Sequence, residues 1–279
     1  MKALFDTLSG TCSRELTKAY STSFSTAVRL LAPSIRQDIY NIYGFVRLAD
    51  EIVDSFIGYE QSALLDRLKQ DTFGSILDGI SLNPILNSFQ ETVNRYAMPH
   101  QLILDFLKSM ETDLIKKTYE SKEEYDKYIY GSADVVGLMC LHIFVKGNAY
   151  RFDELKEAAM RLGSAFQKIN FLRDMKADFE ILGRVYFPGT DFRTLSDTDK
   201  QDIIADIRKD LEQGYAGIKR LPVEAKLGVY VAYRYYRTLL SKLDRIGSED
   251  LKSRRIRVPN YYKFTLFARC YVDHKLNLI

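Results

Sequence analysis

The prolines of this sequence all lie between long amphipathic stretches and never inside one. Proline removes a helical hydrogen bond and clashes with the preceding turn, so helices usually begin or end near one. Apolar residues recur at three- and four-residue intervals in runs at about 12–31, 34–57, 60–78, 84–96, 99–117, 122–146, 152–181, 197–219, 223–246 and 260–276. No segment of the sequence alternates apolar and polar residues beside a hairpin turn, so a pair of β-strands is not indicated. The sequence therefore predicts an all-α protein.

Length and composition bound the number of domains and the kinds of partner. The chain has 279 residues, of which 46% are hydrophobic, and its formal net charge is +3. Because no linker, repeat or low-complexity tract divides it, we expect a single helical domain over residues 1–279 with a sizeable core. So weak a positive charge argues against nucleic acid as the main partner, since that usually needs a strongly basic domain.

The cysteines and the apolar segments favour a cytoplasmic location. Cys12, Cys140 and Cys270 are scattered, odd in number and without metal-ligand spacing, which indicates reduced thiols. The first residues lack the apolar centre of a signal peptide, and no later stretch reaches the roughly 18 uncharged apolar residues of a membrane span. We expect a cytoplasmic protein, with peripheral contact at the inner face of the membrane left open.

The segment YGFVRLADEIVD (43–54) places polar side chains on one face of a helix. At i, i+4, i+7 and i+11 stand Tyr43, Arg47, Asp50 and Asp54. These positions stack on one side of a helix with 3.6 residues per turn. An acid pair at this spacing is usually a solvent-exposed face, but here it is interleaved with apolar residues, which favours a functional site. We call this group the first acid ladder.

A second acid ladder lies in QKINFLRDMKAD (167–178). It consists of Gln167, Asn170, Asp174 and Asp178, with Arg173 beside them. Two carboxylate faces turned toward each other repel unless a cation lies between them. Oxygen ligands without histidine or cysteine point to a hard ion, Mg²⁺ with Mn²⁺ as a possible substitute, which typically also binds substrate phosphates.

These segments resemble the squalene/phytoene synthase family of head-to-head trans-isoprenyl diphosphate synthases, most closely the bacterial phytoene synthases. YSTSFSTAVRLLAP (20–33) is similar to its Ser-x-Ser-Phe segment, and YNIYGFVRLADEIVD (40–54) to its first acid motif. KYIYGSADVVGLMC (127–140) is similar to its central tyrosine-containing helix. AFQKINFLRDMKADFEILGRVYFP (165–188) matches its Gln-x-x-Asn-x-x-Arg-Asp-x-x-x-Asp motif with the trailing Gly-Arg-x-Tyr-x-Pro. The resemblance spans about residues 18–270.

The resemblance implies an isoprenoid-synthase helical bundle around a central apolar cavity, and it implies a role for particular residues. The implied Mg²⁺ ligands are Asp50, Asp54, Asn170, Asp174 and Asp178. The implied diphosphate contacts are Ser21, Ser23, Tyr43, Arg47, Arg173 and Tyr235. The implied catalytic residues at the reaction centre are Tyr130, Gln167 and Arg47. The implied prenyl pocket contains Phe24 and Val28.

Some features keep two interpretations. Asp134 stands where the family commonly has glycine, and either adds an acceptor near the site or pairs with a lysine. Asp113 lies in a family-like segment, yet is also an acid at a basic helix end. The GRVYFP segment (183–188) is a lid or a plain helix end followed by a turn. The basic cluster either closes over a diphosphate or is solvated surface; it comprises Arg254, Arg255, Arg257 and Lys263.

The implied reaction is phytoene synthesis from two geranylgeranyl diphosphates through a cyclopropyl (prephytoene) diphosphate, with release of diphosphate. Squalene or dehydrosqualene synthesis from two farnesyl diphosphates is the alternative, and squalene would need a nicotinamide reductant. The slim side chain of Val28 favours the longer C20 tail. Head-to-tail synthases and terpene cyclases typically carry Asp-Asp-x-x-Asp, whereas this chain has Asp-Glu-x-x-Asp. An inactive assembly factor would be expected to have lost the acid ladders, and both are intact.

Overall fold

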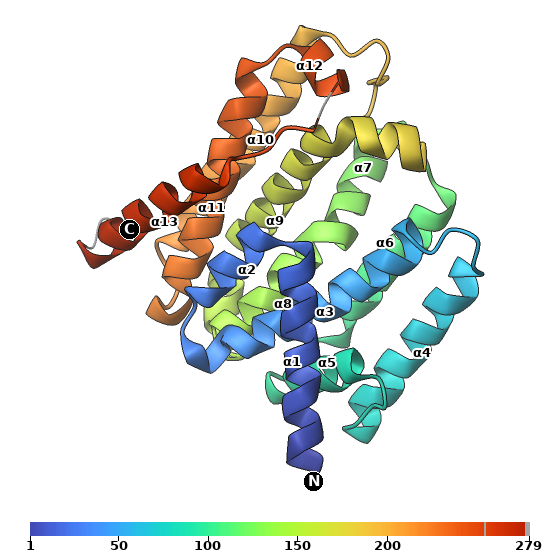
Figure 1. Cartoon of the computed structure of the whole chain (residues 1–279), viewed down its shortest axis with the longest axis vertical. Helices are drawn as coiled ribbons and strands as arrows, with labels where there is room; N and C mark the ends of the chain where they lie inside the picture. Colours follow the sequence, from blue (N-terminus) through green and yellow to red (C-terminus); the bar gives the residue numbers. More distant parts are fainter. Residues whose placement is uncertain (254, 277–279) are drawn as a thin grey trace.

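The computed structural model describes residues 1–253 and 255–276, and these residues form helices joined by short turns (Figure 1). The α-helices are α1 (Lys2–Tyr20), α2 (Thr22–Arg29), α3 (Pro33–Asp54), α4 (Gln61–Asp78), α5 (Pro84–Arg95), α6 (His100–Ile115), α7 (Lys122–Ile129), α8 (Val135–Phe144), α9 (Ala149–Ala177), α10 (Asp197–Ile218), α11 (Val223–Arg245), α12 (Ser248–Ser253) and α13 (Asn260–Lys275). Two π-helical turns are η1 (Tyr130–Asp134) and η2 (Asp178–Leu182). Within the described ranges the only β-type pairing is a single bridge between Thr118 and Val185. The all-α prediction is confirmed.

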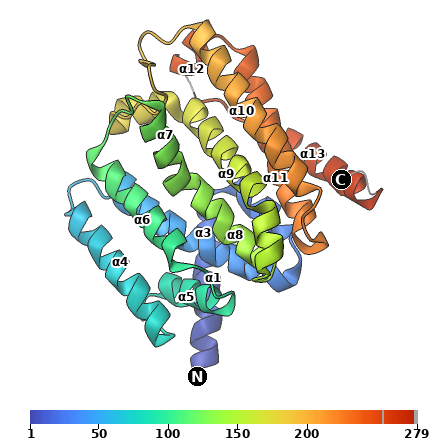
Figure 2. The same cartoon turned by 180° about the vertical axis from the view of Figure 1, so that it is seen from behind.

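Helix α9 runs through the middle of the bundle, as both views show (Figures 1 and 2). It packs against α10 and α11 on one side and against α8 and η1 on the other. Helix α3 packs against α1, α5 and α8, and α2 closes the bundle against α11. Of the helices in the described part of the chain, none is both long enough and apolar enough to cross a membrane. The fold thus holds α3 and α9, the helices with the two acid ladders, inside one bundle.

The prolines predict well where helices start. The helix ends that have no proline nearby are the ones that the hydrophobic periodicity did not predict. Helices begin at Pro33 and Pro84, where the missing N–H would have no helical partner. The predicted run 12–31 is two helices, because the backbone becomes extended at Ser21, whose side chain caps α2 by accepting from Phe24 N. The predicted run 122–146 is α7, η1 and α8 in succession. Helix α12 was not predicted, since a six-residue helix is too short to show a period.

The apolar core consists of two groups of buried side chains. One group is built around α3, α5, α6 and α8, where the Phe45 and Phe89 rings stack with centroids 4.0 Å apart. The other is built around α9, α10 and α11. Such burial, at about 25 cal/mol per Å² of apolar surface, is the main favourable contribution to folding. The space between the two groups is where the candidate site lies.

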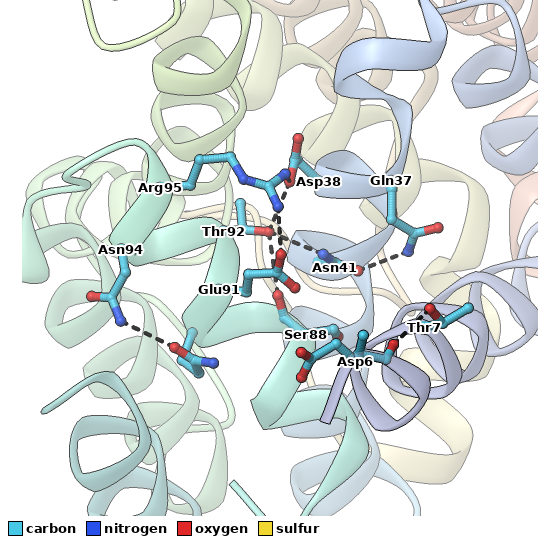
Figure 3. A network of polar contacts seen from close by, with 12 residues as sticks. Asp6, Thr7, Gln37, Asp38, Asn41, Ser88, Glu91, Thr92, Asn94 and Arg95 are labelled. Atoms are coloured by element: carbon cyan, nitrogen blue, oxygen red, sulfur yellow. Dashed lines mark hydrogen bonds and ion pairs between the residues drawn. The ribbon is translucent and has the colours of Figure 1, made fainter. Parts of the chain in front are cut away.

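A buried polar network ties the first half of α3 to α5 (Figure 3). Asp38 on α3 is only 1% exposed. Its carboxylate accepts from Arg95 Nη1 at 2.7 Å, from the Tyr96 hydroxyl at 3.0 Å and from the Thr92 hydroxyl at 3.2 Å. Thr92 in turn accepts from Asn41 Nδ2 at 3.0 Å. These bonds fix the start of the helix whose second half carries the first acid ladder.

Replacing Asp38 by alanine is expected to lower the free energy of unfolding by about 1–3 kcal/mol, because Thr92 and Tyr96 lose a buried acceptor. Turnover of the folded variant should stay close to that of the unaltered protein, since Asp38 does not line the cavity described below. Urea unfolding followed by circular dichroism measures the first quantity. An unchanged unfolding midpoint would contradict the assignment of the network as an anchor for α3.

Candidate active site

A cavity of about 590 Å³ lies between the two core groups, and its wall changes character along its length. Both α3 and α9 line it with apolar residues in their first halves and polar residues in their second halves. The apolar wall includes Phe24, Val28, Leu31, Ile39, Ile42, Leu155, Leu162 and Ile218. The cavity therefore has an apolar end and a polar end, and the acid ladders form the polar end.

The first acid ladder lies along one side of this polar end. Tyr43, Arg47, Asp50 and Asp54 all line the cavity. Arg47 forms an ion pair with Glu51, and its Nη1 lies 3.9 Å from Asp50 Oδ2. Arg184 Nη1 donates to Asp54 Oδ1 at 2.6 Å. The helical spacing thus predicts the shared face correctly, and arginine side chains balance its carboxylates.

The second acid ladder lies opposite, on α9 and the start of η2. Gln167, Asn170, Asp174 and Asp178 line the cavity together with Arg173. Arg173 Nε donates to Asp174 Oδ1 at 2.9 Å, and Arg255 Nε lies 2.6 Å from the same oxygen. Asn170 Oδ1 is buried and has no hydrogen-bond partner. A buried acceptor oxygen without a partner in the polar wall of a cavity is typical of a ligand-binding group.

Burial and nearby like charges raise the pKa of two carboxyl groups of the site, Asp50 and Asp178. Burial raises the pKa of Asp50 to about 7, with the Asp54 charge adding to it, although 32% of the Asp50 side chain is exposed. Burial likewise raises the pKa of Asp178 to about 7, followed by the charges of Asp174 and of Asp54 across the cavity. Like charges brought this close favour protonation or a bound cation. The two ladders therefore act on one another as one acidic site.

The donor set fits a hard divalent cation. It contains four carboxylates and an unpartnered amide oxygen, all of them oxygen ligands. Among residues 1–253 and 255–276, no group of three or more acidic, histidine or cysteine side chains is close enough to hold an ion without other ligands. Ions at either ladder would thus complete their coordination with water and with substrate oxygens, as Mg²⁺ does at phosphate-binding sites.

The prediction that Tyr130 lines the reaction centre is wrong. Tyr130 does not line the cavity; its hydroxyl forms a hydrogen bond with Asp105 on α6. Tyr128, two residues earlier, lines the cavity instead. The resemblance alone does not distinguish the two tyrosines of Tyr128-Ile129-Tyr130. Tyr128 belongs to the last turn of α7, whereas Tyr130 begins the π-helical turn η1. Asp134, at the end of η1, also lies off the cavity wall and accepts from Ser164 Oγ at 2.6 Å.

Two further predicted diphosphate contacts lie elsewhere. Tyr235 does not line the cavity, and Lys263 Nζ lies 5.7 Å from the centre of its ring. Its neighbour Tyr236 lines the cavity and stacks on Phe166 with centroids 4.0 Å apart. Ser23 is also absent from the lining, whereas Ser21 is part of it. The tyrosines of VAYRYYRTLL are too closely spaced for the sequence to choose the one facing inward.

Several side chains of the site are ones whose place the sequence left open. Asp113 is buried and lines the cavity, which favours a place in the site over a plain acid at a helix end. Arg184, in GRVYFP, is 4% exposed and lines the cavity, although Gly183 before it also ends the helix in a left-handed conformation. Within the basic cluster, Arg255 lines the cavity and Arg257 is exposed, while Arg254 lies outside the described residues.

Comparisons with known proteins agree with this geometry. Residues 17–262 match the sequence profile of the family described as squalene/phytoene synthase. The chain is 26% identical over 253 residues to the 15-cis-phytoene synthase of Paracoccus sp., covering 84% of this chain and 82% of that protein. It is 29% identical to phytoene synthase 3, chloroplastic, of Zea mays, covering 92% of this chain but only 64% of that protein.

Solved structures show the same fold at lower identity. A dehydrosqualene synthase crystallised with a ligand superposes with a TM-score of 0.83 at 20% identity, covering 97% of this chain and 98% of that one. A squalene synthase, HpnC from Alicyclobacillus acidocaldarius, gives a TM-score of 0.74 at 21% identity, covering 85% of this chain and 93% of that one. Both likenesses concern the arrangement of the helices around the cavity.

Proposed function

Because the chain belongs to the squalene/phytoene synthase family, we propose that it is a prenyltransferase that joins two prenyl diphosphates head to head. The product is phytoene, formed from two geranylgeranyl diphosphates through a cyclopropyl diphosphate with release of diphosphate. One observation carries this proposal: two facing acid ladders stand at the polar end of a cavity whose other end is apolar. Such a cavity suits ligands with a charged head and a long hydrocarbon tail.

The residues at the polar end have distinct tasks in this reaction. Mg²⁺ held by Asp50, Asp54, Asn170, Asp174 and Asp178 would neutralise the charge on the diphosphate groups. Arg47 and Arg173 supply fixed positive charge beside the ladders. The Phe24 and Tyr43 rings, stacked with centroids 4.7 Å apart, offer aromatic faces to a carbocation. Gln167 adds an amide between these groups at the cavity wall.

The apolar end supports the choice of tail length. Val28 on α2 lines it, and a valine leaves more room than an aromatic side chain at that position. The Paracoccus relative, a 15-cis-phytoene synthase, supports the C20 substrate. The 4,4'-diapophytoene synthase of Staphylococcus haemolyticus, 26% identical over 257 residues, supports the competing C15 pair. We favour two C20 diphosphates as the substrates because the small side chain of Val28 leaves room for the longer tail.

The decisive experiment offers each substrate separately to the purified protein. Geranylgeranyl or farnesyl diphosphate is incubated with the protein and Mg²⁺, with and without a nicotinamide reductant, and the extracted hydrocarbon is identified by mass spectrometry. Phytoene from the C20 diphosphate is the expected result, and its formation should stop with a chelator. A C30 product alone would replace the proposal with squalene or dehydrosqualene synthesis. No hydrocarbon from either substrate would favour the assembly-factor alternative.

Val28→Phe is expected to change substrate preference toward the shorter tail. A C15 tail ends about five carbons before a C20 tail. The larger phenylalanine side chain should therefore hinder the C15 tail less than the C20 tail. Each methylene contact is worth about 0.8 kcal/mol, and losing a few shifts the C20-to-C15 activity ratio about tenfold or more. Overpacking alone costs about 1–3 kcal/mol, so melting is measured as well.

Val231→Phe is the matched control, because Val231 is fully buried on α11 but does not line the cavity. It should lower the melting temperature and leave the C20-to-C15 ratio unchanged. If the folded Val28→Phe protein keeps the original ratio, Val28 is ordinary core and another wall selects the tail.

A further inference from the structure

Asp134 is a buried acidic residue at the end of η1 for which the proposed reaction has no use. It is 7% exposed and lies off the cavity wall, although Ala133 before it lines the cavity. Its Oδ1 accepts from the hydroxyl of Ser164 on α9 at 2.6 Å, and Ser164 is 5% exposed. Burying a carboxyl group is costly unless it is hydrogen-bonded. The bond that joins η1 to α9 is therefore the feature to explain.

The lysine partner that the sequence left open for Asp134 is not formed. Lys168 on α9 donates to Asp210 on α10 at 2.7 Å. Arg161, also on α9, has its Nη1 3.6 Å from the same carboxylate. Within the described part of the chain, no lysine or arginine forms an ion pair with Asp134. The cations on this side of α9 thus contact α10 (Figure 2), and Asp134 has a hydroxyl as its partner.

The bond lies where the backbones of η1 and α9 cross closely. A Cβ atom on Gly163 would lie 2.9 Å from the carbonyl oxygen of Ala133 and 3.4 Å from the Cα atom of Asp134. Ala133 and Gly163 both line the cavity, so this crossing is part of its wall. Along α9 the lining changes from Leu162 to Gln167. The crossing therefore stands where the apolar end of the cavity meets the polar end.

We propose that Asp134 is a positioning residue that links η1 to α9 through Ser164 and so fixes the spacing of the two cavity walls where the polar and apolar ends meet. Its action is hydrogen bonding alone, and no bond of the substrate passes through it. The inference rests on the proposed head-to-head reaction only for its activity readout, because the stability of the folded protein reports the link without substrate.

The surroundings of Asp134 favour its neutral form. The charged and titratable groups that face it come from η1, α9 and α10; they are Tyr130, Arg161, Lys168 and Asp210. Burial raises the pKa of Asp134 to about 7; the hydrogen bond from Ser164 lowers this pKa and the Asp210 charge raises it, while the cations lower it. An aspartate in the unfolded chain titrates near pH ~4. Because the folded chain holds this proton more tightly, ionising Asp134 costs stability progressively from about pH 4 to about pH 7, and the full cost is present above that range.

The first test measures hydrocarbon formation from geranylgeranyl diphosphate and Mg²⁺. Asp134→Ala and Ser164→Ala should each lower turnover by up to about 10²-fold, as a displacement of about 1 Å in a site does. The double variant should lose no more than either single variant, because both changes remove the same bond. Asp134→Asn keeps an acceptor oxygen for Ser164 and should retain most of the turnover. Circular dichroism verifies that each variant is folded.

Ser109→Ala is the matched control. Ser109 on α6 is 6% exposed and packs against the other side of η1, where its Cβ would lie 2.8 Å from a Cβ on Gly131. Its hydroxyl donates to the carbonyl oxygen of Phe106, so this hydrogen bond stays within α6. Ser109 does not line the cavity. Its substitution should leave turnover unchanged and should not alter the effect of Asp134→Ala.

Urea unfolding without substrate tests the link independently of the reaction. The midpoint of Asp134→Asn relative to that of the unaltered protein should rise from about pH 5 to about pH 7 and then level off, because asparagine does not ionise. For Ser109→Ala this difference should not depend on pH. The midpoint losses of Asp134→Ala and Ser164→Ala should also fail to add in the double variant.

The inference is overturned if folded Asp134→Ala or Ser164→Ala keeps the turnover of the unaltered protein. It is overturned equally if their losses multiply in the double variant, or if the Asp134→Asn difference in midpoint does not change with pH. If the unaltered protein makes no head-to-head hydrocarbon, the proposed function has failed, and the urea midpoints alone decide whether Asp134 links η1 to α9.

Discussion

Substituting Asp50 by alanine is expected to lower turnover by about 10³-fold or more while the protein remains folded. Asp50 stands between Arg47 and Asp54 on the cavity-facing side of α3. A metal ion that neutralises developing charge is worth several kcal/mol in the transition state, and each 1.36 kcal/mol is about a factor of ten in rate. Hydrocarbon formation at saturating Mg²⁺ measures the loss.

The stability of Asp50→Ala should move in the opposite direction to that of Asp38→Ala. Asp50 faces like charges in the metal-free protein, so its removal relieves repulsion, whereas Asp38 is held by three hydrogen-bond donors. Melting in the presence of a chelator should show an unchanged or higher midpoint for Asp50→Ala. If this variant keeps most of its activity at saturating Mg²⁺, the assignment of the first acid ladder is wrong.

Gly163→Ala is expected to reduce both stability and turnover, although it adds a single methyl group. A Cβ atom at Gly163 would lie 2.9 Å from the carbonyl oxygen of Ala133 and 3.3 Å from its carbonyl carbon. Because the obstacle is backbone, α9 itself must move away from η1. Overpacking of this kind costs about 1–3 kcal/mol in unfolding free energy. A displacement of about 1 Å also costs about 10²-fold in rate, and α9 carries the second acid ladder.

Gly74→Ala on α4 provides the control, because a Cβ atom there has no neighbour within 4 Å. It should leave turnover unchanged and stabilise the protein by about 0.4–1 kcal/mol, through the unfolded chain. Urea unfolding and hydrocarbon formation are measured for both variants. If Gly163→Ala behaves like Gly74→Ala, the close crossing of α9 and η1 does not constrain the site.

Properties that repeat along one helix could be predicted from the sequence. The apolar period gives most of the helices, and the same period places both acid ladders on the cavity face. These predictions succeed because a helix converts spacing into direction without help from the rest of the chain.

Sequence reasoning failed where two residues of one type stand close together and where the partner is distant in sequence. The resemblance implied Tyr130 at the reaction centre, but Tyr128 lines the cavity and Tyr130 does not. Arg184 contacts Asp54 at a separation of 130 residues, and Arg255 contacts Asp174 at a separation of 81. No spacing rule connects such residues, so the arginines that balance the acid ladders become visible only in the folded chain.

The division of the cavity into one polar end and one apolar end has a consequence for the shape of the product. In the proposed reaction, two substrates whose heads share the polar end would lie side by side, and the hydrocarbon would form as a hairpin with its centre at the ladders and both tips at the apolar end. The apolar end of the cavity would then limit the length of each arm, and not the full length of the product.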